Sequence, residues 1–272
     1  MTIHTYYAPE TVLPPQTDML TSRAMVTEAY TVIPRGVLRD IVVSELPDWT
    51  NTRTWILNRP VAGGATTFAQ YLIEVAPGGG STDPEPEAGV ESFVFLLQGA
   101  LALTLGGVTH ELAPGGFAFL PPGSQWAVAN TGNELAKFQW IRKAYQPLAG
   151  HTPKAVIGNE QDIEPDAMPG TDNKWRTTRL LPTTDMAYDM HINVVTFEPG
   201  ASIPFAETHV MEHGLYVLEG KAVYRLNRDW VEVEAGDFMW LRSFCPQACY
   251  AGPTRFRYLL YKDVNRHMKL PF

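Results

Sequence analysis

The feature that most limits how this chain can fold is a long internal repeat. The stretches VAPGGG, VESFVFLLQGALAL and LAPGGFAFLPPGSQW, within residues 75–126, return as FEPGAS, MEHGLYVLEGKAVY and VEAGDFMWLRSFCPQ within residues 197–247. Gly99 matches Gly220 and Gly115 matches Gly236 at one constant offset. Such self-similarity indicates that one structural unit is present twice. We therefore interpret the chain as a duplication.

Each copy consists of strand-length segments rich in Val, Phe, Tyr, Leu and Thr, separated by Gly and Pro. No segment of useful length keeps the apolar spacing of an amphipathic helix, so we predict an all-β chain with helical turns only near residues 159–167. Short strands joined by glycine turns favour two tandem β-barrels of the jelly-roll kind, closed to hide their edges. The predicted strands are residues 92–97, 100–105, 116–120, 191–197, 215–218, 222–226, 230–233 and 257–262.

The repeat also predicts where the units begin and end. We expect an N-terminal arm over residues 1–60 that lies across one barrel, and a first barrel over residues 61–142. Residues 143–185 are rich in Pro, Asp, Asn, Lys and Thr, which is typical of a linker, although part of it could add strands. The second barrel is predicted over residues 186–272.

Charge and composition restrict the partners. A formal charge of -8 argues against nucleic acid or an anionic membrane, since either calls for a clustered basic face. A small-molecule substrate is the better expectation. The N-terminus lacks the basic start and apolar core of a signal peptide, and no run reaches membrane-span length, so we expect a cytoplasmic protein. Cys245 and Cys249 are expected to be reduced, half-buried thiols.

The segment ETHVMEH in the second copy carries the chemistry. Glu207 and His209 are two residues apart, so on a strand both side chains point to the same face, and His213 can return toward it after a turn. A carboxylate and two imidazoles inside a barrel are costly to bury unless they share a cation. The alternative is two surface residues and one hydrogen-bonded core histidine. Three good ligands in so short a window favour a divalent metal site.

These residues resemble the motifs of the cupin superfamily, whose first motif is G(X)5HXH(X)3,4E(X)6G and whose second is G(X)5PXG(X)2H(X)3N. His209 fits the first motif by spacing, and six residues separate His213 from Gly220, but the outer identities are exchanged. The histidine of the second motif falls on Gln247, counted from Gly236.

The resemblance implies a ligand set of Glu207, His209, His213 and Gln247. This pattern looks like that of the (S)-ureidoglycine aminohydrolases of purine catabolism, which are bicupins with a manganese site. The segments RLLPTTDMAYDMHI and YLLYKDVNR are also similar to that family. The resemblance thus implies two tandem cupin barrels, with Mn²⁺ bound in the second.

The first copy lacks these ligands. Its second motif is nearly complete in PPGSQWAVAN, yet Trp126 stands where the metal ligand belongs, and an indole has no lone pair for a metal. Ser92 matches His213, while Ala88 and Pro86 fall near the places of His209 and Glu207. We therefore expect the first barrel to be structural.

In the family that this chain resembles, tyrosines and a lysine hold the substrate, which implies that role for Tyr224, Tyr258 and Lys262. Tyr258 and Lys262 are four apart on one predicted strand and so share a face. The alternative is ordinary barrel filling for the tyrosines and a solvated lysine. A buried lysine needs an anion, which a substrate carboxylate would supply. His191 is expected in the core or an interface, and Arg225 and Arg257 are expected to point outward.

The resemblance implies hydrolysis of (S)-ureidoglycine to (S)-ureidoglycolate and ammonia. Two alternatives remain open. Two histidines and a carboxylate also form the site of iron-dependent oxygenases, although Gln247 as a fourth ligand counts against this. A non-catalytic metabolite-binding bicupin is the other. As a small bicupin with an N-terminal arm, the protein is expected to be a homo-oligomer.

Overall fold

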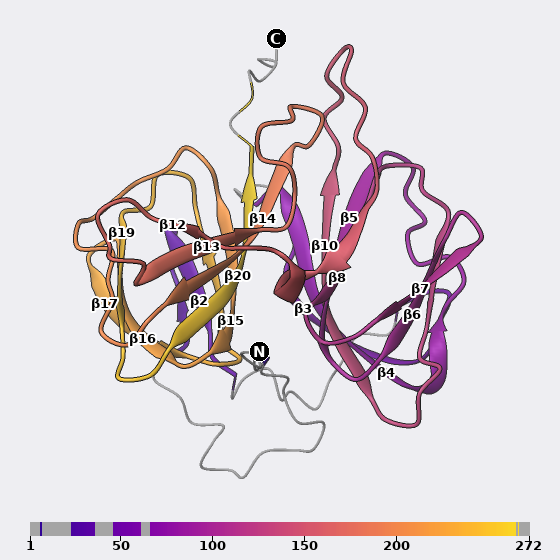
Figure 1. Cartoon of the computed structure of the whole chain (residues 1–272), viewed down its shortest axis with the longest axis horizontal. Coiled ribbons are helices and arrows are strands. Elements are labelled where there is room, and N and C mark those ends of the chain that lie inside the picture. Colours follow the sequence, from indigo (N-terminus) through magenta and orange to yellow (C-terminus); the bar gives the residue numbers. More distant parts are fainter. Residues whose placement is uncertain (1–5, 7–22, 36–45, 61–65, 265, 267–272) are drawn as a thin grey trace. The chain divides into compact units, whose positions relative to one another are not determined.

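The computed structural model describes residues 6, 23–35, 46–60, 66–264 and 266 and confirms an all-β chain (Figure 1). Its described residues form two compact units, one for each copy of the repeat. A single 3-10 turn, η1 (Glu160–Asp162), lies in the region where helical turns were predicted. No described helix is both long and apolar enough to cross a membrane.

The N-terminal unit is one strongly bent sheet of nine strands. Its long strand β4 pairs with β3 and β10 over most of its length, and its last residues, Gly80 and Ser81, turn to pair with β9. This change of partner curls the sheet around an apolar core that includes Phe138 and Trp140. The strands are β3 (Trp49–Asn58), β4 (Phe68–Ser81), β5 (Val90–Gln98), β6 (Leu101–Leu105), β7 (Val108–Leu112), β8 (Gly116–Leu120), β9 (Trp126–Ala129), β10 (Ala136–Ala144) and β11 (Val156–Asn159).

The C-terminal unit contains an eight-stranded and a three-stranded sheet with a shared core. In β16, buried Ala222, Tyr224 and Leu226 alternate with exposed residues, as expected for a strand with one face on the core. The strands are β1 (Met25–Val26), β2 (Tyr30–Ile33), β12 (Asp166–Ala167), β13 (Trp175–Arg179), β14 (Met190–Phe197), β15 (His213–Glu219), β16 (Lys221–Leu226), β17 (Asp229–Glu234), β18 (Phe238–Leu241), β19 (Gln247–Ala251) and β20 (Phe256–Asp263).

The predicted N-terminal arm is divided between the two units. Strand β2 pairs with β18 of the C-terminal unit, and in Figure 1 it lies among the strands of that unit. Tyr30 is fully buried there and donates a hydrogen bond to Asp229 Oδ2 at 2.5 Å. Strand β3, in contrast, pairs with β4 of the N-terminal unit. The prediction of a separate arm is therefore corrected, because pairing between distant strands assigns each piece to a barrel.

The predicted linker is corrected in the same way. Strand β11 pairs with β8 and so extends the N-terminal sheet. Strands β12 and β13 form the edge of the eight-stranded sheet in the C-terminal unit, where β13 pairs with β14. The expectation that part of the linker adds strands is confirmed. This addition matters for function, because β13 forms one wall of the pocket described below.

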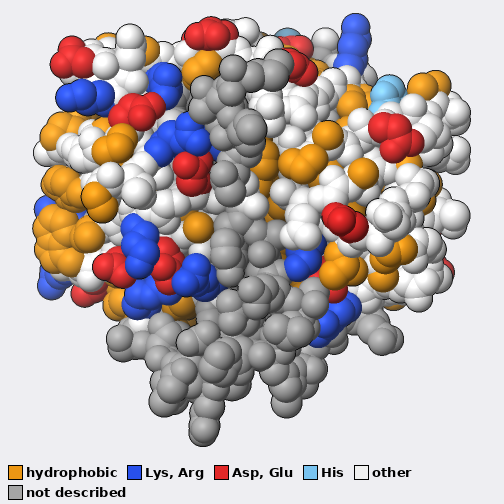
Figure 2. All heavy atoms as spheres, turned by 60° about the horizontal axis from the view of Figure 1, so that its bottom comes forward, with side chains coloured by type: hydrophobic (Ala, Val, Ile, Leu, Met, Phe, Trp, Pro, Cys, Tyr) orange, Lys and Arg blue, Asp and Glu red, His pale blue; other side chains and the backbone are white. Residues whose placement is uncertain are grey.

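On the face shown in Figure 2, basic and acidic side chains are interspersed with apolar ones. Among the described residues, several charged side chains form ion pairs, such as Arg255 with Glu219 at 3.0 Å and Lys221 with Glu234 at 3.1 Å. Ion pairs that stay in contact with solvent contribute about 0–1 kcal/mol each to folding. Burial of the two apolar cores therefore carries most of the stability.

Candidate active site

Backbone pairing brings the four predicted metal ligands to one end of the C-terminal barrel. Glu207 and Gln247 exchange two backbone hydrogen bonds of 2.9 Å each, so their side chains start side by side. His213 is the first residue of β15 and pairs with Leu241 on one side and Lys262 on the other. The sequence alone could not give these cross-strand neighbours.

A strained turn positions the remaining histidine. The backbone N–H of Phe244 donates to the carbonyl of His209 at 2.6 Å. Phe244 has φ +66°, a left-handed conformation that glycine adopts readily, and Gly123 occupies the matching place in the first copy with φ +77°. Such a conformation costs a bulky residue on the order of 1–3 kcal/mol. The strain thus falls at the turn that fixes the His209 backbone.

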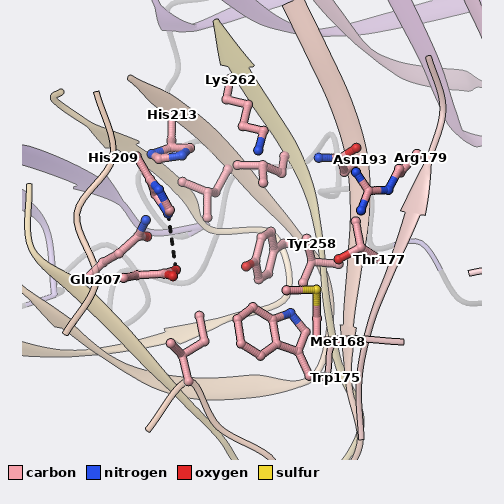
Figure 3. A pocket seen from close by; sticks show the side chains of 15 residues that line it. Met168, Trp175, Thr177, Arg179, Asn193, Glu207, His209, His213, Tyr258 and Lys262 are labelled. Atoms are coloured by element: carbon pink, nitrogen blue, oxygen red, sulfur yellow. Dashed lines mark ion pairs between the residues drawn. The ribbon is translucent and has the colours of Figure 1, made fainter. Parts of the chain in front are cut away.

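The side chains of Glu207, His209, His213 and Gln247 all line one pocket of about 170 Å³ (Figure 3). Glu207 Oε1 lies 3.4 Å from His209 Nε2, and the rings of His209 and His213 are 5.2 Å apart. Among the described residues, no three His, Cys, Asp or Glu side chains lie close enough to hold an ion as they stand. Glu207 and His209 are 21% and 32% exposed, which gives their side chains room to rotate.

Burial keeps His213 in the form that a metal ligand requires. Its side chain is almost fully buried, and the pKa of His213 falls from 6.5 to about 3, first because of desolvation and then because of nearby His209 and Lys262. The imidazole is therefore neutral at physiological pH, with a lone pair on one ring nitrogen. The donor set, a carboxylate, two imidazoles and a carboxamide, suits a divalent ion such as manganese, iron or zinc.

The opposite wall of the pocket comes from β13, β14 and β20. Tyr258 and Lys262 of β20 both face the pocket, as their spacing predicted. The pKa of Lys262 is lowered, first by burial and then by Arg179, while Glu207 acts in the opposite direction. Among the described residues, no carboxylate lies within ion-pair distance of the Lys262 ammonium. A small anion can fill that place.

Tyr224 occupies a different position. It is fully buried and is absent from the residues that line the pocket. Its ring centroid lies 6.3 Å from that of Tyr258 in an edge-on contact. Burial raises the pKa of Tyr224 well above 10, so its hydroxyl stays neutral. Tyr224 therefore supports Tyr258 from behind.

The prediction that Arg225 and Arg257 point outward is correct for the first residue and wrong for the second. Arg225 is exposed, as predicted. Arg257 faces away from the pocket, but it is fully buried rather than outward in solvent, and its Nη1 lies 3.7 Å from Glu219 Oε2. This correction has a physical reason, because strand alternation fixes the face of a side chain but not what covers that face. Both cysteines are free, as predicted, and are buried rather than half-buried.

Sequence analysis missed the pocket residues that precede the second copy of the repeat. Met168, Trp175, Thr177 and Arg179 come from the segment predicted as a linker, and Asn193 comes from β14. The two-residue spacing of Trp175, Thr177 and Arg179 places them on one face of a strand. That spacing was the available signal, but it does not reveal which sheet the strand joins.

The matching place in the N-terminal unit contains an internal ion pair. Ser92 pairs with Arg142 there, as His213 pairs with Lys262 in the other unit. Arg142 Nε donates to Glu85 Oε2 at 2.6 Å, and its guanidinium lies 5.0 Å from the Trp140 ring. Trp126 is buried beside them at the start of β9, as Gln247 is at the start of β19. The first barrel thus offers a paired cation and an indole where the second offers metal donors.

Comparison with known proteins agrees with this architecture. The family model described as Cupin domain matches residues 71–142 and 193–252, one segment in each unit. A structure of the putative glyoxylate induced protein from Pseudomonas aeruginosa superimposes with a TM-score of 0.92 at 60% identity, covering 98% of this chain and 99% of that one. The chain is therefore a two-barrel cupin.

Relatives with names narrow the family further. The (S)-ureidoglycine aminohydrolase of Escherichia coli strain K12 is 31% identical over 258 residues, which cover 93% of this chain and 95% of the relative. The probable (S)-ureidoglycine aminohydrolase of Oryza sativa subsp. japonica is 37% identical over 227 residues, covering 83% of this chain and 71% of the relative. The chain belongs to the (S)-ureidoglycine aminohydrolase family.

Proposed function

We propose that this protein hydrolyses (S)-ureidoglycine to (S)-ureidoglycolate and ammonia and depends on bound Mn²⁺. In this reaction the C–N bond to the amino group breaks and a C–O bond to the oxygen of water forms. One proton of water leaves with ammonia, and the other stays on the new hydroxyl group. The observation that carries the proposal is the similarity over nearly the whole chain to relatives named for this activity. A pocket of about 170 Å³ also suits a substrate smaller than the ligands of typical drug-sized pockets.

Manganese would be held by Glu207, His209, His213 and Gln247. When bound, such an ion supplies Lewis-acid chemistry by polarising the group that it contacts. The protein keeps His213 neutral by burial and ties Glu207 to Gln247 through the backbone. These are the contributions of the chain itself to a metal centre.

Lys262 would bind the substrate carboxylate. An ammonium group that is partly buried without a carboxylate partner is stabilised when an anion enters. Tyr258, at the base of the same wall, would position the substrate through its hydroxyl, because burial raises the pKa of Tyr258 and keeps the group neutral. Tyr224 would fix the ring of Tyr258 rather than contact the substrate.

The alternatives differ in what they require. An iron-dependent oxygenase needs O2, and a non-catalytic metabolite-binding bicupin releases no product. A cytoplasmic location and a homo-oligomeric state stay predictions from the sequence.

The test is an ammonia-release assay under argon. Because the substrate is an unstable aminal, it is generated in place from allantoate by an allantoate-degrading enzyme. We expect the protein to speed ammonia release and to yield one enantiomer of ureidoglycolate. Release no faster than in the enzyme-free control, or release only with O2 present, would reject the aminohydrolase.

Lys262→Met tests the carboxylate contact in the same assay. A lost charge-assisted hydrogen bond is worth about 1.5–3 kcal/mol, so kcat/KM should fall roughly 10- to 100-fold. The bound metal should stay, since Lys262 is not a ligand. The matched control is Lys221→Met, which removes an exposed lysine outside the pocket and should leave kcat/KM unchanged. A normal kcat/KM in Lys262→Met would contradict the assignment.

A further inference from the structure

Asn193 is a buried polar residue of the pocket that the roles above leave unused. Its side chain lines the pocket from β14, and the residue is only 4% exposed. Its Oδ1 has no hydrogen-bond donor among the described residues. A buried carbonyl oxygen without a donor costs on the order of 1–3 kcal/mol, so such groups are rare unless a ligand or water completes them.

The neighbours of Asn193 explain which kind of group it can bind. Arg179 lies directly opposite Asn193 in the β13–β14 pair, but Arg179 Nε already donates to Asp166 Oδ2 at 2.7 Å and its side chain is 44% exposed. Lys262 is the partly buried cation suited to a carboxylate. Asn193 is uncharged and has both N–H donors and a carbonyl acceptor. It therefore suits an uncharged group with the same two functions.

Figure 3 places these groups at separate corners of the pocket. Glu207 and His209 lie on one side, Asn193 and Arg179 lie across from them, and Lys262 lies between the two sides. A carbon atom that carries an amino group, a carboxylate and a third polar substituent can place all three at these corners in only one of its two enantiomeric configurations. The corner that contains Asn193 and Arg179 must therefore bind the third polar substituent.

We propose that Asn193 is a specificity-determining residue that pairs with the carbamoyl end of the substrate. Its carboxamide N–H donates to the carbamoyl oxygen, and its Oδ1 accepts from the carbamoyl NH2, which gives two hydrogen bonds between complementary amides. This inference rests on the proposed function, because the substrate proposed there has a ureido group. It adds a recognition residue for that group.

Such a contact discriminates by leaving a buried group unpaired when the wrong ligand binds. A pocket built to accept an N–H rejects an analogue that lacks it, because Oδ1 then stays without a donor. N-carbamoylglycine and N-acetylglycine form a matched pair of stable probes. They share the carboxylate, the carbonyl and the number of heavy atoms, and they differ by NH2 against CH3 at the end that Asn193 faces.

The experiment compares the dissociation constants of the two probes for the full-length protein loaded with Mn²⁺. From a lost hydrogen bond and an unpaired acceptor we expect the wild type to prefer N-carbamoylglycine by about 10-fold or more. Asn193→Leu, similar in size, should reduce the preference to within about threefold, mainly through weaker N-carbamoylglycine binding. If the Asn193→Leu variant does not fold, the Asn193→Ala variant is used in its place. The control Thr177→Val changes a pocket residue on β13 and should keep the preference.

A wild-type ratio near one overturns the proposal by itself, whether or not any variant folds. A preference that persists in the Asn193 variants overturns it as well, since the residue would then have only a structural role. Binding needs no turnover, so this comparison stays interpretable if the ammonia assay fails. Conversely, active enzyme that does not discriminate between the probes rejects the role of Asn193 and leaves the proposed reaction intact.

Discussion

Two histidines of the C-terminal barrel are kept neutral by burial rather than by a partner. His191 lies directly opposite Lys262 in the β14–β20 pair, and the pKa of His191 falls from 6.5 to about 4. Desolvation is the main cause, followed by the positive charges of Lys262 and Arg179. The prediction of a core or interface role for His191 is compatible with its half-buried position on β14.

This shift predicts a pH dependence of stability. Between pH 6.5 and about 4 the unfolded chain binds a proton at His191 that the folded chain does not, so acid favours unfolding in that window. Above pH 6.5 the group is neutral in both states and contributes no slope. Urea denaturation of wild type and His191→Gln should therefore show a smaller loss of unfolding free energy in the variant between pH 7.5 and 4.5. Equal losses would contradict the depressed pKa.

At the scale of elements, the turn between β15 and β16 shows how tightly the strands of a barrel corner approach each other. Gly220 has φ +77°, and a Cβ at this position would lie 2.1 Å from the carbonyl oxygen of Arg255. Gly99 fills the matching turn of the first copy under the same restriction, with a Cβ 2.5 Å from the Leu135 carbonyl oxygen. The repeated glycine thus reflects a repeated close approach of two backbones.

Gly220→Ala should cost considerably more than Gly200→Ala. Gly200 has φ +71°, but a Cβ there would meet nothing within 4 Å. Gly200→Ala should therefore lower the free energy of unfolding by only about 1 kcal/mol, the cost of the left-handed conformation. Gly220→Ala adds a clash with the backbone and should lower it by more than about 2 kcal/mol. Chemical denaturation measures both. Equal costs would show that the chain around residue 255 moves aside freely.

At the scale of the whole molecule, we expect about one manganese per chain. Among the described residues, the C-terminal barrel brings the four predicted donors to one pocket, whereas at the matching place of the N-terminal barrel Glu85 is paired with Arg142 and Trp126 is buried. His209→Ala or His213→Ala should remove most of the metal, as measured by elemental analysis of protein purified without added metal. Two ions per chain would be inconsistent with this assignment.

Trp126→His tests whether the N-terminal barrel can bind a metal once a histidine stands at the place that matches Gln247. The new imidazole would share its pocket with Ser92 and the Glu85 carboxylate, but Glu85 is already paired with Arg142, and an imidazole without free partner ligands binds divalent ions weakly. Metal content should therefore stay near one per chain. A rise toward two would show that the first barrel is more than structural.

Much of this protein could be read from its sequence. The repeat predicted two barrels, the glycine spacing aligned them, and strand alternation correctly placed Tyr258 and Lys262 on one face. The segment ETHVMEH, together with Gln247, predicted four residues that the structure brings to one pocket. Each of these is a local property or a match between two copies, which a linear pattern contains in full.

Only the tertiary structure decided which distant strands pair and what covers each face. It placed β2 beside β18, made β13 a wall of the pocket, buried Arg257 and separated Tyr224 from the pocket. Asn193 gained its importance because the assembled barrel makes it line the pocket and leaves its side-chain carbonyl buried without a donor among the described residues. A strand specifies its own alternation, but its partner is selected by the summed burial and hydrogen bonding of the whole barrel, and no local pattern contains that sum.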